Sequence, residues 1–282
     1  MIKLPLKNFH LVMCFVIGIL ITPTSYASAS EKSLDELIVL SGLRGQIEQF
    51  PKLMKAGMQS AKDEGSTFSD SAYALILASI DQTILSSEIL VMVKGALAIE
   101  LSSADVEQLL SWYASDLGRQ ITQAEANSST ADADSKILAL ESQLLTNTER
   151  LDFAQRFDQL LGATDMNIEL QKHSSVAIFS AMMTATHPQQ VIDISPFLDQ
   201  IETLSEQSRP VIEKDILLAF IYAYQDIETK ELIRYENFLN EVKSKEFNRI
   251  VVKSLSAAIE LSISKWSRSL VSIFQHKNIT VL

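Results

Sequence analysis

Apolar residues recur at intervals of three and four between residues 102 and 126, which is the spacing of one face of an α-helix. Ser102 precedes this series as a helix N-cap, and Asp105 stands three residues later in the position of a capping box. We therefore predict one amphipathic helix over residues 102–126, with a close backbone approach at Gly118. Its buried face consists of Val106, Leu109, Leu110, Tyr113, Leu117 and Ile121.

The same helical spacing covers the rest of the chain. Glycine and proline are scarce, at 8 and 6 residues, and no stretch of convincing length alternates between apolar and polar residues as a strand does. We predict an all-α fold with no significant β-sheet. The expected helices are 33–41, 44–62 after a break at Gly42, one from Ser69 or Asp70, 86–99, 102–126, 136–161, 164–186, one from Ser195-Pro196, 211–224 begun by Arg209-Pro210, and 229–274.

The pattern of residues 101–121 returns 126 positions later. Residues 101–106 match residues 227–232, Trp112-Tyr113 matches Phe238-Leu239, and Arg119 matches Lys245. A weaker match, 120 positions apart, relates residues 39–43 to residues 159–163. Any two amphipathic helices share some of this similarity, but the common start signal, aromatic residue and basic residue favour a duplication.

We therefore predict tandem duplicated helical bundle units. The first covers residues 30–127 and the second residues 136–282, and residues 128–135, which are polar and contain Asp132 and Asp134, form a linker between them. The second unit includes a long bridging helix at its start and a long C-terminal helix at its end.

The motif from Asp105 to Arg119, with Trp112-Tyr113 at its centre, resembles the signature of a bacterial periplasmic family catalogued as domain of unknown function 2059. The Leu-x-x-Leu-Ser-Gly-Leu segment at residues 37–43 extends the resemblance. The resemblance implies an exported helical protein, and it supplies no catalytic residues to carry over.

Residues 1–29 have the pattern of a secretory signal peptide. Lys3 and Lys7 precede an apolar run over residues 11–21, which is shorter than the roughly 20 residues that span a membrane. Small residues at the end of the segment predict cleavage after Ala27 or Ala29. The alternative is an uncleaved anchor. We expect a periplasmic protein, and cleavage would remove Cys14, the only cysteine, so that neither disulfides nor cysteine metal sites would form in the mature chain.

The mature chain is strongly acidic. The formal charge of −11 becomes −13 without Lys3 and Lys7, which argues against binding of nucleic acid. Basic residues gather between residues 230 and 277, and we interpret them as the solvated face of a helix. The alternative is that this C-terminal arm docks on an acidic partner protein or makes peripheral contact with anionic lipid headgroups.

No set of side chains in the sequence has the spacing of a known reactive site. His173, His187 and His276 are far apart and lack the spacing of metal ligands. Neither a Gly-x-Ser-x-Gly elbow nor a glycine-rich phosphate loop occurs. We predict no catalytic residue, no metal and no cofactor.

The repeated motif supplies the candidate ligand or partner surface. Its aromatic members are typical of a helix core, although they can also floor an apolar pocket. The leading hypothesis is a non-catalytic interaction or scaffold protein of the cell envelope. The alternatives are a carrier or sensor that holds a lipid or other apolar molecule between helices and, third, a cryptic hydrolase. The candidate residues are Trp112, Tyr113, Arg119, Phe238, Lys243, Lys245 and Arg249.

Overall fold

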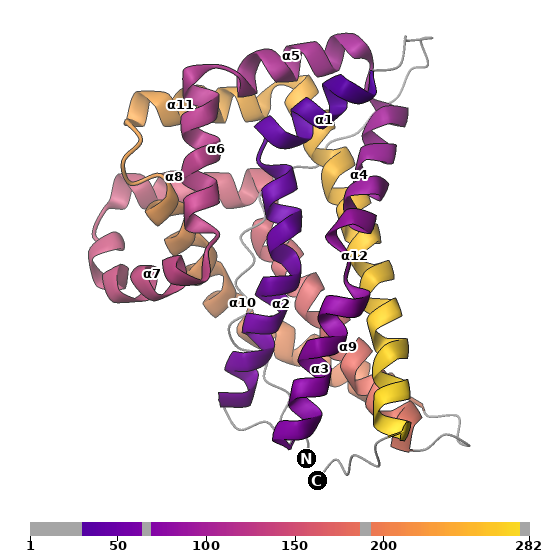
Figure 1. The fold of residues 1–282 in the computed structure, drawn as a ribbon. Coiled ribbons are helices and arrows are strands. Elements are labelled where there is room, and N and C mark those ends of the chain that lie inside the picture. The colour runs from indigo at the N-terminus through magenta and orange to yellow at the C-terminus, as the bar shows by residue number, and fades with distance from the viewer. Residues whose placement is uncertain (1–29, 64–68, 187–192, 277–282) are drawn as a thin grey trace.

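The computed structural model describes residues 30–63, 69–186 and 193–276, and these form an array of α-helices without a β-strand (Figure 1). The all-α prediction is confirmed. The predicted signal peptide (1–29) and His187 lie outside the described residues. The helices are α1 Glu31–Leu40, α2 Leu43–Asp63, α3 Asp70–Thr83, α4 Ser86–Glu100, α5 Ser103–Tyr113, α6 Asp116–Ser128, α7 Ala131–Leu144, α8 Thr148–Leu161, α9 Ala163–Thr186, α10 Ser195–Ala223, α11 Thr229–Asn240 and α12 Val242–His276.

Buried apolar residues from all of these helices form one continuous core, so the two predicted units share it. The 35-residue helix α12 extends along the length of the molecule and packs on α9 and also on α3 and α4 of the N-terminal half (Figure 1). Trp266 of α12 is fully buried, and its indole N–H donates a hydrogen bond of 2.8 Å to Ser79 Oγ of α3. The C-terminal helix therefore holds both halves together.

The predicted capping box at Ser102 is confirmed, but the helix that follows it is shorter than predicted. Ser102 Oγ accepts a hydrogen bond from the Asp105 N–H, and the Asp105 carboxylate accepts one from the Ser102 N–H. The single helix predicted over residues 102–126 is wrong, because α5 ends at Tyr113 and α6 begins at Asp116. Ser115 causes the break: its hydroxyl accepts the N–H of Gly118 at 3.0 Å and so caps a new helix.

Gly118 allows the corner between α5 and α6 to close. A Cβ at this position would lie 2.2 Å from the carbonyl oxygen of Trp112 and 2.9 Å from Tyr113 Cα. The backbone therefore approaches the glycine closely, as the sequence predicted. A side chain is excluded here by lack of space and not by backbone angles, because only Gly42 and Gly162 are glycines with positive φ among the described residues.

The segment predicted as a polar linker, residues 128–135, is not an extended loop. Helix α6 continues to Ser128 and α7 begins at Ala131, so most of this segment is helical. Thr130 caps α7 by accepting the Ala133 N–H, and Asp132 and Asp134 lie in its first turn, where negative charge favours a helix N-terminus. The aspartates that suggested a solvated loop are helix-start residues.

Two further predicted helix boundaries are corrected. The helix expected over residues 136–161 is interrupted because Asn147 caps α8 by accepting the Arg150 N–H, and the one expected over residues 229–274 breaks at Glu241, whose backbone is extended. Pro210 does not begin a helix but lies inside α10, which starts at Ser195 with a proline in its first turn as predicted.

The two halves follow the same order of elements. Helices α5 and α11 begin 126 positions apart, and so do α6 and α12. Gly42 ends α1 with a φ of 75°, and Gly162, 120 positions later, ends α8 with a φ of 59°. The order of helices in the first half therefore corresponds to the order in the second: α1 to α8, α2 to α9, α3–α4 to α10, α5 to α11 and α6 to α12. Helix α7 has no counterpart in this order.

The contrast between two glycines tests the role of the α5–α6 corner. We expect Gly118→Ala to lower the free energy of unfolding by about 1–3 kcal/mol, because its methyl group overlaps the backbone. Gly95→Ala in α4 is the matched control, since no atom lies within 4 Å of its Cβ position. It should raise the free energy of unfolding by about 0.5–1 kcal/mol through helix propensity. Urea denaturation measures both, and equal effects would contradict this account of the corner.

Candidate functional site

The two copies of the predicted motif meet through their aromatic residues. Trp112 of α5 stacks on Phe238 of α11, with ring centroids 3.9 Å apart and planes inclined by 8°. These residues are 126 positions apart and occupy the same place in the two copies. Tyr113 meets Phe238 edge-on at 5.5 Å, and both residues are buried. Tyr113 and Phe238 thus belong to the core, as their helical spacing indicated, and the partly buried Trp112 packs against it.

The aromatic contacts continue into the second half. Tyr235 of α11 also stacks on Trp112, with ring centroids 5.4 Å apart, and its ring lies 5.6 Å from that of Phe157 of α8. Phe157 in turn contacts Phe220 and Tyr224 at the end of α10. We call this set the aromatic cluster; its members are Trp112, Tyr113, Phe157, Phe220, Tyr224, Tyr235 and Phe238. Its rings contact one another and join α5 to α8, α10 and α11.

Glu125 of α6 places a carboxyl group beside the aromatic cluster. Its Oε1 accepts hydrogen bonds from the hydroxyls of Tyr224 at 2.7 Å and Tyr235 at 2.8 Å. Burial raises the pKa of Glu125, and the two hydroxyl bonds offset only part of that rise. The pKa of Tyr113 is also raised, first by its own burial and then by the nearby Glu125 carboxylate. A group of the first half is thus bound by two groups of the second.

Glu125 was not among the predicted site residues, although the sequence contains a signal for it. Glu125 follows Ile121 by four residues and so continues the apolar face of α6. A carboxyl group on the buried side of a helix needs partners, because an unpaired buried charge is costly. The tyrosines that supply those partners are 99 and 110 positions away, which helical spacing does not reveal.

Two basic residues of the candidate surface bind acidic residues of the first half. Lys243 lies 2.8 Å from Asp105 and Arg249 lies 2.6 Å from Glu100. Burial acts to raise the pKa of Asp105, but hydrogen bonds from Lys243 and Ser102 outweigh it and lower that pKa. These two basic residues of the C-terminal arm are thus paired with acidic residues of the same chain.

The remaining basic residues of the candidate surface stand apart from these pairs. Arg119 is exposed, and its Nε donates to the carbonyl oxygen of Ala114 at 2.9 Å, where it caps the end of α5. Lys245 is partly buried and forms no ion pair with a described residue. Six of the seven predicted residues are therefore divided between the aromatic cluster, internal ion pairs and a helix cap, and Lys245 belongs to none of these groups.

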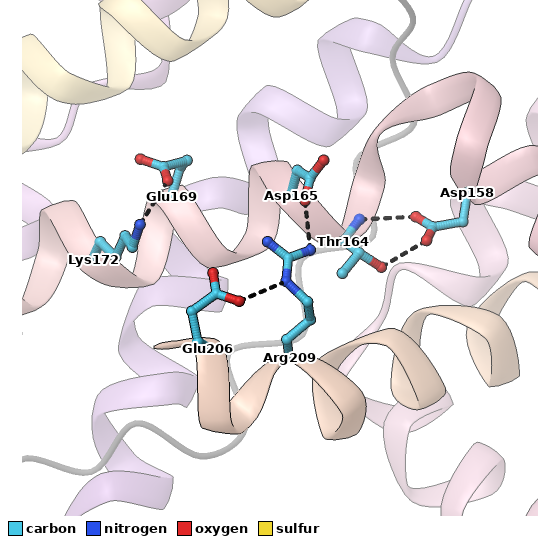
Figure 2. A network of polar contacts seen from close by, with 7 residues as sticks. All are labelled: Asp158, Thr164, Asp165, Glu169, Lys172, Glu206 and Arg209. Atoms are coloured by element: carbon cyan, nitrogen blue, oxygen red, sulfur yellow. Dashed lines mark hydrogen bonds and ion pairs between the residues drawn. The ribbon is translucent and has the colours of Figure 1, made fainter. Parts of the chain in front are cut away.

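A second polar network joins α8, α9 and α10 (Figure 2). Arg209 of α10 contacts Asp165 of α9 at 2.6 Å and Glu206 of its own helix at 3.4 Å. Asp158 accepts hydrogen bonds from the N–H and hydroxyl of Thr164 at the start of α9. These contacts fix the helices relative to one another. No group of three or more His, Cys, Asp or Glu residues in the described parts of the chain is placed to hold a metal ion.

Helix α4 carries an apolar stripe that no part of the described chain covers. Val91 is 71% exposed and Ile99 is 85% exposed, and Met92 lies beside them at 37%. Gly95 is exposed between them with open space at its Cβ position. We call these four residues, Val91, Met92, Gly95 and Ile99, the α4 face. Contiguous exposed apolar residues of this kind mark binding surfaces more often than scattered ones do.

The charged residues beside the α4 face are paired within the protein. Lys94 lies 2.8 Å from Asp35 of α1. Glu88 pairs with Lys265 of α12, which leaves little free charge along this edge. The charges of Glu88 and Lys94, which lie beside the α4 face, are thus neutralised by ion pairs within the protein.

The α4 face belongs to an unusually apolar part of the chain. By length and composition alone, Asp70–Glu100 is the one stretch among the described residues that qualifies for crossing a membrane, and a third of its most apolar window is buried. A break at Ile84–Leu85 divides it into helices of 14 and 15 residues. Each is shorter than the roughly 20 residues that a membrane span requires.

Comparison with known proteins identifies no relative. No protein-family model matches the chain, and neither a curated protein nor a solved structure matches it. The resemblance of residues 37–43 and 105–119 to domain of unknown function 2059 stays a prediction.

Glu125 gives the stability of the protein a defined dependence on pH. Because its pKa is raised in the folded state, its stabilising contribution is fully present below the ordinary glutamate pKa and is lost as pH rises through the raised value. Glu125→Gln keeps the acceptor oxygen but removes the titration. Between about pH 4 and pH 8, unfolding free energies from urea titrations should therefore fall for wild type relative to the variant. A difference that does not change with pH would refute this role.

Lys243 and Lys245 form a matched pair for testing the internal ion pairs. Lys243→Ala removes a partner of the mostly buried Asp105 and should lower the free energy of unfolding by about 1 kcal/mol. Lys245→Ala should change it by less than about 0.5 kcal/mol. Thermal melting followed by circular dichroism compares the two variants, and equal melting temperatures would show that the Lys243 pair does not contribute.

Proposed function

We propose that the chain is an exported, non-catalytic protein of the cell envelope that binds a protein partner through the α4 face. The observation that carries the proposal is the exposure of Val91 and Ile99 on a helix whose opposite side is firmly packed in the core. A packed helix with exposed aliphatic residues, whose neighbouring residues Glu88 and Lys94 form ion pairs within the described chain, suits a partner that docks an apolar helix face.

The α4 face is better suited to docking than the surface predicted from the motif. Tyr113 and Phe238 are buried, and Lys243 and Arg249 are engaged by Asp105 and Glu100. Val91 and Ile99, in contrast, are mostly exposed in the fold and gain free energy when a partner covers them, at about 25 cal/mol per Å² of apolar area.

The aromatic cluster supports a structural role over that of a carrier. Trp112 and Phe238 are in face-to-face contact at 3.9 Å, and the hydroxyls of Tyr224 and Tyr235 are both bound to Glu125. The stacked rings and the hydrogen-bonded hydroxyls join the two halves of the protein. A molecule bound between them would have to separate the stack.

We also propose that the fold arose by tandem duplication and that the protein is exported to the periplasm. The paired starts of α5 and α11 and of α6 and α12, together with the left-handed glycines Gly42 and Gly162, support the duplication. The basic and apolar pattern of residues 1–29 and the resemblance to a periplasmic family support export.

Site-specific crosslinking in the producing cell tests the proposed function. A photo-activated phenylalanine analogue at position 91 should capture a discrete protein, because Val91 is an exposed residue of the α4 face. The same analogue at Leu138 of α7 is the matched control, since Leu138 is 72% exposed and apolar but lies on another helix. Equal capture at both positions, or none at position 91 in a normally folded protein, would count against the α4 face.

A further inference from the structure

Helices α4 and α12 lie side by side and run in opposite directions (Figure 1). Glu88, in the first turn of α4, pairs with Lys265 in the C-terminal part of α12. Glu100, the last residue of α4, pairs with Arg249 in the N-terminal part of α12. These ion pairs fix the register of the two helices, so residues equally far inward from the Glu88–Lys265 pair stand at the same level.

The exposed apolar residues of α4 continue onto α12 at the level of Met92. Met92 and Leu261 each lie one helical turn inward from the Glu88–Lys265 pair and therefore on the side of the helices that carries that pair. Leu261 is 44% exposed. The apolar surface is thus two helices wide. We call it the α4–α12 surface; its members are Val91, Met92, Gly95, Ile99 and Leu261.

Helix α10 holds in the second half the place that α4 holds in the first. The buried residues of α4 are Ile89, Val93 and Leu97, and the residues 123 positions later in α10 are buried as well. The neighbouring helices correspond too, because α4 packs on α1, α2 and α12, and α10 packs on α8, α9 and α6. A further neighbour of α10 is α7, which has no counterpart in the described part of the first half.

Helix α7 runs antiparallel to α10. Glu141 of α7 lies 2.7 Å from Lys214 of α10. The pKa of Lys136, at an earlier position in α7, is raised mainly by Asp132 and also by Tyr222 of α10. As the chain advances along α7, its contacts therefore move back along α10.

The side of α10 that α7 covers corresponds to the α4 face. At the separation of 123 positions, Val91, Gly95 and Ile99 correspond to Lys214, Leu218 and Tyr222. Leu218 is buried at 2% exposure, whereas Gly95 is exposed. A helix therefore covers the side of α10 that remains open on α4, and a helix is the kind of element that fits the open side.

Helix α12 makes one border of the α4–α12 surface basic. Its 35 residues include six lysines and arginines but only two glutamates, in a chain whose formal charge is −11. Internal ion pairs engage Lys243, Arg249 and Lys265. Lys253 and Arg268 are exposed and form no ion pair with a described residue. Acidic side chains of a partner would meet complementary charges there.

The helix that covers α10 is itself acidic. Helix α7 contains Asp132, Asp134 and Glu141 against a single basic residue, Lys136. Glu141 binds a basic residue of α10, as described above. An acidic amphipathic helix thus covers this side in the second half, and the charges of α12 suit a helix of the same character in the first.

We propose that the partner docks through an acidic amphipathic helix, which lies antiparallel to α4 across the α4–α12 surface in the position that α7 takes on α10. The inference rests on the proposed function, because it names the element by which that partner binds. The apolar side of the partner helix covers the α4–α12 surface, and Gly95 leaves room for its backbone to approach closely. Its acidic residues face Lys253 and Arg268.

A single helix suits this surface better than a bilayer or a second copy of the chain does. Electrostatic interactions at the protein surface are screened within about 8 Å at physiological ionic strength, so a narrow helix meets chiefly the local basic charge of α12. An anionic bilayer or a second copy covers a wider area and meets more of the acidic surface, and the formal charge of −11 repels both.

The order of crosslinks along the partner tests the inference. The photo-activated phenylalanine analogue is placed at position 91 or 99, crosslinking is carried out in the producing cell, and the captured partner residues are identified by mass spectrometry. The residue captured from position 99 should precede the one captured from position 91 by about eight residues, which is two helical turns. The analogue at position 261 should capture the same helix. The reverse order, or captured residues without helical spacing, would overturn the inference.

Charge reversal tests the acidic character of the partner helix. Lys253→Glu combined with Arg268→Glu should lower capture at position 91 by about fivefold or more. The matched control is Lys230→Glu combined with Arg234→Glu, which changes the net charge equally at exposed positions of α11 and should alter capture by less than about twofold. Equal effects in two normally folded variants would contradict an acidic helix beside α12.

The outcomes separate this inference from the proposed function. Absence of capture at position 91 in the folded protein would overturn both. Capture at position 91 with the wrong order of crosslinks, or without dependence on Lys253 and Arg268, would overturn only the inference. Crosslinks to a second copy of the chain, or binding to vesicles of phosphatidylcholine and phosphatidylglycerol in place of capture, would assign the surface to a dimer or a membrane instead.

Discussion

The stack of Trp112 on Phe238 is the contact on which the arrangement of the two halves depends. Each residue stands near the end of the first helix of a corner, α5–α6 in one half and α11–α12 in the other. Because the two rings lie face to face at 3.9 Å, the corners are held against each other, and α12 is directed back along α4 and α3. Glu125 reinforces the same junction from α6 through the hydroxyls of Tyr224 and Tyr235. One contact region thus decides which surfaces are covered and which stay exposed.

Charge within this acidic protein is organised around the same junction. The basic residues of the C-terminal arm that face the first half are bound to Glu88, Glu100 and Asp105. Their uneven distribution along the sequence therefore reflects internal pairing as well as solvation. Such partly exposed pairs contribute little stability individually, but they neutralise the borders of α4. What remains on α4 is an apolar face on a charged molecule, and this contrast supports its assignment as a docking surface.

Local signals in the sequence were sufficient for the fold class and for several helix ends. The capping box at Ser102, the break at Gly42 and the close approach at Gly118 were predicted because each depends on neighbours within a few residues. The prediction of one continuous helix over residues 102–126 was wrong. The apolar residues keep the same helical spacing on both sides of Ser115, so the spacing does not reveal the break there. Asp132 and Asp134 were misread for a similar reason, since acidic residues suit a helix start as well as a loop.

The candidate site was less accessible to sequence reasoning because its contacts are distant along the chain. Nothing local indicates that Tyr224 and Tyr235 meet Glu125, or that Asp105 meets Lys243. The aromatic residues singled out by the repeat were correctly suspected of belonging to the core. The α4 face was missed altogether, because a hydrophobic helix predicts burial on every side and only the packed structure shows which side has no neighbour.

The most direct test of the account is the reactivity of a thiol at position 99 toward a maleimide, compared between intact producing cells and the purified protein. Cys14→Ser leaves Ile99→Cys as the single thiol. If a protein partner covers the α4 face, labelling should be slow in cells and fast after purification, while a thiol introduced by Leu138→Cys should react equally in both. Equal labelling at position 99 in cells and after purification would contradict the central claim that a partner docks on this face.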